Sequence, residues 1–181
     1  MIRLADPVSE RDHARGPATA RLTLVEYGDF ECPHCGHAFP VLAHVRRAFG
    51  PNLRFVFRHF PLRASHPHAG LAAEAAEAAG AQGKFWEMHD RLYERQDEID
   101  AKGLRRHARK IGLDVDRFEQ DLVGQLHRER IRQDIAGGAR SGVNGTPTFY
   151  INGVRYDGEW EDHTVFMTAL VRAATGREPG E

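Results

Sequence analysis

A long stretch without strand signal separates two short strand-rich ends of this chain. From about residue 67 to residue 140 the apolar residues recur at helical spacing, whereas runs of β-branched and aromatic residues occur before and after it. We therefore expect one sheet built from both ends, with an inserted all-helical subdomain between them. The expected helices fall at about 67–80, 84–95, 102–111, 114–123 and 125–141.

The first strand-rich end predicts a strand, a helix and a second strand. Residues 1–20 are polar and interrupted by proline and glycine, which predicts an irregular arm. A strand is expected at 22–27, a helix from Pro33 onward and another strand at 53–58. This order predicts a parallel pair with a right-handed crossover, and a proline suits the first turn of the crossover helix.

The second strand-rich end predicts a hairpin followed by a helix. Apolar runs at 148–151 and 154–156 flank Asn152 and Gly153, the dipeptide that best supports a two-residue type I′ turn. An amphipathic pattern at 161–174 predicts the last helix. The chain is therefore expected to be an α/β protein with a mixed sheet, made of a β-α-β half and a β-β-α half.

Length and charge narrow the classes of protein that this chain can belong to. With 181 residues it is expected to form a single domain over 1–181. A formal net charge of −1 makes nucleic acid an unexpected partner. No stretch approaches the roughly 18 apolar residues needed to span a membrane, so membrane insertion is not expected. The first residues lack the apolar core of a signal peptide. As written, the chain is expected in the cytoplasm, or in the periplasm or another extracytoplasmic compartment if an export signal preceded it.

The two cysteines of the chain lie three positions apart, in the sequence Cys32-Pro33-His34-Cys35. They follow the first expected strand and precede the first expected helix. Two thiols at this spacing can close a small disulfide ring, and a helix N-terminus stabilises a thiolate on the first of them. The pair predicts a thiol-disulfide exchange site with Cys32 as the nucleophile and an accessible first sulfur, while Cys35 can be buried.

These features together resemble the DsbA-like thiol-disulfide oxidoreductases of the thioredoxin superfamily. The resemblance covers about residues 20–175 and is carried by the cysteine motif, the pair Thr146-Pro147 before a strand, the hairpin with its final helix, and the length of the helical insert. It implies a thioredoxin-like core at 20–62 and 142–176 and a helical insertion at 63–141.

The resemblance also implies roles for individual residues. Cys35 is the resolving thiol, and Thr146 with Pro147 forms a cis-proline loop that binds extended substrate; sequence alone favours an ordinary trans proline there. His34 stabilises the Cys32 thiolate, or is simply a solvent-exposed turn histidine.

Two orientations are open for Glu26, because strand residues alternate between the two faces of a sheet. The resemblance implies a partly buried carboxylate that relays the proton of the resolving thiol. A carboxylate that points to solvent is an equal alternative.

Two other functions remain open on sequence grounds. The same fold can give Cys32, Cys35 and a histidine, His34 or His37, to a metal, although a closed tetrahedral site is awkward at these positions. A thiol-dependent transferase acting on glutathione conjugates is disfavoured by the second cysteine.

The leading hypothesis is an enzyme that exchanges disulfides with protein or peptide thiols. It needs no organic cofactor and no metal, but does need a redox partner that re-oxidises or reduces the cysteine pair. The motif favours an oxidant, whereas a cytoplasmic address favours a thioredoxin-like reductase.

Overall fold

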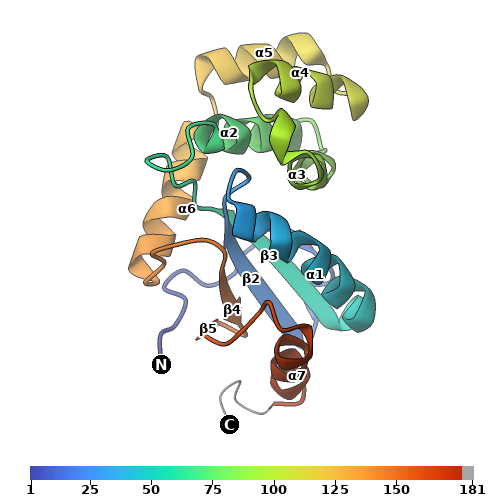
Figure 1. The fold of residues 1–181 in the computed structure, drawn as a ribbon, viewed down its shortest axis with the longest axis vertical. Helices are drawn as coiled ribbons and strands as arrows, with labels where there is room; N and C mark the ends of the chain where they lie inside the picture. The colour runs from blue at the N-terminus through green and yellow to red at the C-terminus, as the bar shows by residue number, and fades with distance from the viewer. Residues whose placement is uncertain (177–181) are drawn as a thin grey trace. The chain divides into compact units, whose positions relative to one another are not determined.

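The computed structural model describes residues 1–176, which form two compact units (Figure 1). The first, here called the sheet unit, consists of Met1–Gly28, His37–Arg58 and the chain from Gly137 onward. The second, here called the helical unit, consists of Asp29–Gly36 and His59–Ala136. The single domain expected from length, with its core at 20–62 and 142–176, stays a prediction.

A five-stranded mixed sheet forms the centre of the sheet unit, in the order β1-β3-β2-β4-β5. The neighbours β1 and β3, β2 and β4, and β4 and β5 are antiparallel. Helix α1 joins β2 to its neighbour β3, the crossover that parallel strands require. The bounds are β1 His13–Arg15, β2 Leu22–Gly28, α1 Pro33–Phe49, β3 Leu53–His59, β4 Thr148–Ile151 and β5 Val154–Tyr156. All strands and helices predicted for these regions are therefore present.

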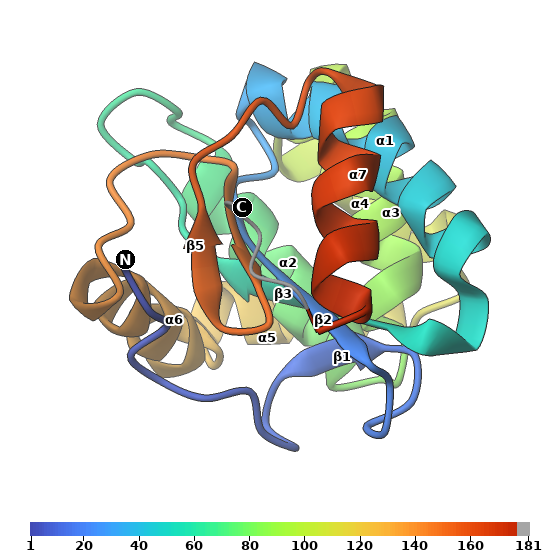
Figure 2. The same cartoon turned by 90° about the horizontal axis from the view of Figure 1, so that it is seen from below.

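The central strand β2 explains why the sheet forms here. Six of its seven residues are buried, as is typical of a strand covered on both faces. The side chains of Tyr27 on β2 and Tyr150 on β4 meet edge to face, with ring centroids 5.9 Å apart. Helix α7, His163–Ala174, lies beside α1 along the sheet (Figure 2), and the rings of His44 and His163 are 4.4 Å apart.

The hairpin between β4 and β5 has the predicted turn. Asn152 and Gly153 have φ of +49° and +79°, the left-handed backbone that a type I′ turn requires at both central positions. The Asn152 side chain accepts a hydrogen bond from the Thr23 backbone N–H at 2.8 Å. The hairpin prediction is thus confirmed, and its turn is held to the start of β2.

The prediction of an irregular arm over residues 1–20 is wrong in part. Residues 13–15 form β1 at the sheet edge, and Arg3 makes an isolated bridge to Val154. The guanidinium of Arg58 holds this arm: its Nε and Nη2 donate to the two carboxylate oxygens of Asp12 at 2.7 and 3.0 Å, and its Nη1 donates to the Tyr27 hydroxyl at 3.1 Å. Burial acts to lower the pKa of Arg58, but the hydrogen bonds to Asp12 and Tyr27 outweigh it and raise that pKa.

The helical unit is built around α2, which packs against α3, α4 and α5. Nine of the twelve residues of α2 are buried, and most of these are alanines, so neighbouring helices can approach closely. In α3 the apolar side chains Phe85, Met88, Leu92 and Tyr93 are buried. The helices are α2 Ala69–Gly80, α3 Phe85–Glu94, α4 Ala101–Lys110, α5 Val115–Gly124 and α6 Arg128–Arg140.

Two further observations complete the fold. Short 3-10 turns occur at Gly50–Asn52, before β3, and at Gln96–Glu98, between α3 and α4. Among residues 1–176, no helix combines the length and the apolar character needed to cross a membrane.

Candidate active site

The four residues of the cysteine motif form the start of helix α1. Pro33 is its first residue, where the missing N–H costs no helical hydrogen bond. The Cys32 carbonyl accepts the first helical bond from Gly36 N–H at 3.1 Å, and the Cys32 N–H donates to the Asp29 carbonyl at 3.1 Å. Cys32 thus occupies the N-cap position, where the exposed peptide N–H groups of the first turn favour negative charge.

Burial distinguishes the residues of the motif. Pro33 and His34 are exposed, whereas Cys32 is 3% exposed and Cys35 is fully buried. The burial of Cys35 agrees with a resolving role. The accessibility of the Cys32 sulfur stays a prediction, because the 3% describes the residue as a whole. The residue lies between a turn and the first helical residue, a position that another side chain braces.

That brace is the side chain of Gln96, in the 3-10 turn after α3. Its Nε2 donates to the carbonyls of Phe30 and Cys32, both at 2.9 Å. A Cβ on Gly36 would come within 2.2 Å of Gln96 Oε1, so glycine is what leaves room for the amide. The residue after the second cysteine therefore helps to fix the backbone of the first.

A buried carboxylate, that of Asp29, organises the turn before Cys32. Its Oδ1 accepts from the Glu31 N–H at 2.8 Å, and its Oδ2 accepts from the Leu62 N–H at 2.8 Å. The same Oδ2 lies 2.7 Å from Nδ1 of His66. The turn that carries the cysteine is thereby tied to the loop that follows β3.

The pKa of the His66 imidazole in this cluster is raised. Burial acts to lower the pKa of this imidazole, but the hydrogen bond to Asp29 and the negative charges of Asp29, Cys32 and Glu31 outweigh burial and raise that pKa. Protonated His66 therefore interacts favourably with a negatively charged Cys32.

The other three predicted site residues belong to the sheet unit. Glu26 lies on β2 opposite Phe149 and is 1% exposed, so the alternative of a carboxylate that points to solvent is wrong. Thr146 and Pro147 are half-buried in the loop before β4, and the peptide bond between them is cis. The Thr148 hydroxyl closes this loop by donating to the Gly145 carbonyl at 2.8 Å.

The predicted residues thus divide between the units: Cys32, Pro33, His34 and Cys35 share one helical turn, and Glu26, Thr146 and Pro147 lie in the sheet unit. Sequence reasoning missed Asp29, His66 and Gln96, which surround the cysteine turn. The one available signal was the density of histidines at 59–68, the segment after β3.

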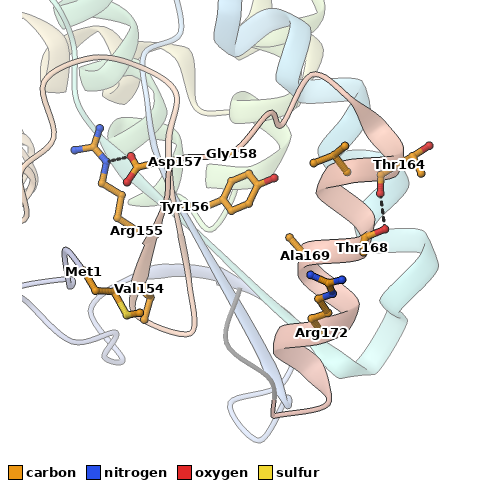
Figure 3. A pocket seen from close by; sticks show the side chains of 11 residues that line it. Met1, Val154, Arg155, Tyr156, Asp157, Gly158, Thr164, Thr168, Ala169 and Arg172 are labelled. Atoms are coloured by element: carbon orange, nitrogen blue, oxygen red, sulfur yellow. Dashed lines mark hydrogen bonds and ion pairs between the residues drawn. The ribbon is translucent and has the colours of Figure 1, made fainter. Parts of the chain in front are cut away.

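The sheet unit also has a surface hollow of about 530 Å³ (Figure 3). It lies between β5 and α7, and the Tyr156 side chain points toward the helix. Nε of Arg155 donates to Oδ1 of Asp157 at 2.7 Å. None of the predicted site residues lines it.

The fold and the cysteine turn together define a class of protein, the proteins with a thioredoxin-like fold. Residues 8–168 match the family model described as Thioredoxin. The chain belongs to this family.

Solved structures with the same architecture are DsbA-like oxidoreductases. BdbD from Bacillus subtilis superimposes with a TM-score of 0.85 at 20% identity, over 97% of this chain and 99% of that one. A thioredoxin-like oxidoreductase from Silicibacter pomeroyi gives a TM-score of 0.80 at 29% identity, over 92% and 94% of the two chains. The α-DsbA1 protein of Wolbachia pipientis gives 0.81 at 21%, over 96% and 95%. The predicted α/β fold of DsbA-like type is therefore confirmed.

Curated relatives of this chain are named as antiporters, unlike the solved structures above. A protein of Salinispora tropica named Na(+)/H(+) antiporter NhaA 3 is 45% identical over an alignment of 187 positions, which covers 99% of this chain but 28% of that protein. A protein of Herminiimonas arsenicoxydans named Na(+)/H(+) antiporter NhaA is 44% identical over 94% of this chain and 27% of that protein. This chain spans less than a third of the length of these relatives.

Proposed function

We propose that this protein exchanges disulfides with protein or peptide thiols through Cys32 and Cys35, in the oxidising direction. The observation that carries the proposal is the placement of the pair: Cys32 caps helix α1, and Cys35 is buried in its first turn. The helix N-terminus stabilises a thiolate on Cys32, which favours the reduced pair and makes the disulfide a better oxidant.

The proposed reaction passes two electrons from a substrate to the cysteine pair. A substrate thiolate attacks Sγ of Cys32, the Cys32–Cys35 bond breaks, and Cys35 leaves as a thiolate that takes up a proton. A second substrate thiolate then attacks the substrate sulfur of the mixed disulfide and expels Cys32 as a thiolate. A partner disulfide must afterwards re-oxidise the pair. No organic cofactor or metal takes part.

The remaining predicted residues have supporting roles in this proposal. His34, exposed beside Cys32 in the motif, stabilises its thiolate, and Pro33 starts the helix. Glu26, a buried carboxylate, relays the proton of Cys35. Thr146 and Pro147 offer backbone groups to an extended substrate segment.

The name of the curated relatives suggests another activity, but the matched part is less than a third of those proteins. We therefore base the proposal on the cysteine turn. An oxidising role fits an extracytoplasmic compartment, because glutathione keeps such pairs reduced in the cytoplasm. A cytoplasmic location would fit a reductase instead.

The reduction potential of the pair in glutathione buffers tests the proposal. An oxidant of DsbA type has a potential near about −120 mV, and a thioredoxin-like reductase near about −270 mV. The oxidised protein should also form disulfides in reduced, unfolded ribonuclease A, and C35S should accumulate a mixed disulfide through Cys32.

Two results would contradict the proposal. A potential near the lower value would support the reductase alternative. Stoichiometric zinc in the purified protein, with no exchange activity, would support the metal-binding alternative.

A further inference from the structure

Two carboxylate–histidine pairs connect the turn before Cys32 to the loop after β3. Oδ2 of Asp29 lies 2.7 Å from Nδ1 of His66, and Oε1 of Glu31 lies 3.0 Å from Nδ1 of His68. The two pairs differ in burial: the Asp29 side chain is fully buried and that of His66 is 18% exposed, whereas the His68 side chain is 47% exposed. The first pair is therefore the better shielded from solvent, and its charges interact more strongly.

The Asp29 carboxylate has little freedom to turn away from His66. The backbone N–H groups of Glu31 and Leu62 each donate to one of its oxygens at 2.8 Å. The backbone carbonyl of Asp29 accepts a hydrogen bond from the Cys32 N–H. The loop side is fixed as well, because the His66 N–H donates to the Leu62 carbonyl at 2.9 Å. The imidazole and the Cys32 backbone are thus held by the same aspartate.

Charge at this position favours a protonated imidazole. Despite burial, the pKa of His66 is raised by its hydrogen bond to Asp29 and by the negative charges of Asp29, Cys32 and Glu31. His68 is the hydrogen-bond partner of Glu31. Because coupling between two titrating groups is reciprocal, a Cys32 charge that stabilises protonated His66 is stabilised by it to the same extent.

We propose that the Asp29–His66 pair is a positioning element of the active site, which keeps a protonated imidazole within electrostatic reach of Cys32 and so stabilises its thiolate. This inference rests on the proposed function, because it names a group that tunes the reactive thiol. The thiolate stabilisation holds while His66 is protonated and is lost as pH rises through the pKa of His66.

The pH dependence of Cys32 alkylation tests the role directly. In reduced H66Q, the profile of iodoacetamide reaction at Cys32, followed by peptide mass mapping, should move to higher pH by about half to one unit. On the acidic limb this means an alkylation rate about threefold to tenfold lower than in the wild type. The matched control is H68Q, which removes the exposed histidine of the neighbouring pair and should leave the profile within about 0.2 unit of the wild type.

Two outcomes of that experiment would overturn the inference. The first is an unmoved profile in H66Q. The second is an equal movement in H66Q and H68Q, which would indicate a general loosening of the loop.

A second measurement tests the same charge coupling through the pKa of His66. NMR titration of the His66 ring should give a lower pKa in C32S than in the reduced wild type, because the variant removes the thiolate charge. An unchanged His66 pKa in C32S would overturn the inference even if H66Q folded poorly.

A failure of this inference can be distinguished from a failure of the proposed function. Absence of disulfide exchange with a shifted H66Q profile would refute the oxidoreductase assignment and leave the charge coupling intact. Exchange activity with an unmoved profile would refute only the role of His66.

Discussion

The sheet unit and the helical unit bury polar side chains in different ways. In the sheet unit the guanidinium of Arg58, which stays charged at any physiological pH, is paired with Asp12 and joined to Tyr27. In the helical unit the buried polar groups include histidines: Nε2 of His59 lies 2.7 Å from Glu77, and His89 packs among aromatic rings. The sheet unit thus buries a guanidinium beside its carboxylate partner, and the unit with the cysteines buries imidazole side chains.

The largest expected effect is on the fixed charge of the sheet unit. Asp12→Ala leaves the guanidinium of Arg58 buried without its carboxylate, and we expect the free energy of unfolding to fall by about 3–5 kcal/mol. Urea denaturation followed by circular dichroism measures this loss. Glu129→Ala is the control, because it breaks an ion pair whose side chains are 68% and 70% exposed and should cost less than about 1 kcal/mol. Equal costs would mean that the buried pair does not hold the arm.

The next effect concerns close packing in the helical unit. Ala76 on α2 is fully buried, so Ala76→Leu inserts a larger side chain between packed helices and should cost about 1–3 kcal/mol. The same substitution at the exposed Ala101 of α4 should be nearly neutral. Thermal unfolding of both variants checks this, and a neutral Ala76→Leu would mean that the unit is loosely packed.

Helix caps allow the two units to be compared with the same chemical change. Asp162 caps α7 in the sheet unit by accepting from Thr164 and Val165, and Asp100 caps α4 in the helical unit by accepting from Gly103. Each Asp→Ala variant should cost about 1 kcal/mol, and each Asp→Asn variant much less.

Hydrogen exchange resolved along the chain then tests the predicted single domain. If the units unfold together, either Asp→Ala variant lowers protection in both. Protection lost in one unit alone would contradict a single domain.

The smallest effect is a pH dependence of the helical unit. Burial, followed by the charge of Arg91, lowers the pKa of His107, whose Nε2 lies 3.0 Å from the Glu98 carbonyl. The neutral ring therefore contributes stability that is fully present above about pH 6.5 and is lost as pH falls toward the lowered pKa. We expect His107→Gln to weaken the decline in the free energy of unfolding between pH 6.5 and pH 5, and the exposed variant His37→Gln to leave it unchanged. Identical curves for His107→Gln and wild type would contradict this assignment.

Local patterns were sufficient to predict most of the fold. The Asn152-Gly153 turn, the apolar run of β2 and the face of α3 each follow from residues adjacent in sequence or one helical turn apart. The strand β1 was missed because it is three residues long, lies at the sheet edge and has no apolar alternation. It pairs with β3, a strand about forty positions away, and Arg58 of β3 binds the adjacent Asp12.

The candidate site shows the same limit. Cys32 and Cys35 could be predicted as a redox pair because two thiols three positions apart can close a small disulfide ring. Asp29, His66 and Gln96 were not, since Asp29 and His66 are 37 positions apart and Gln96 is 64 positions from Cys32, and none belongs to a short motif. Such partners become visible only when the backbone brings them together.

The contact between Gln96 and Gly36 has a consequence for protein engineering. Variation of the residues that flank a reactive cysteine is a natural way to alter its reactivity, but position 36 does not offer this freedom. Any side chain there would displace the Gln96 amide from the carbonyls of Phe30 and Cys32. A library of variants around the motif should therefore keep glycine at position 36 and vary the two exposed positions between the cysteines.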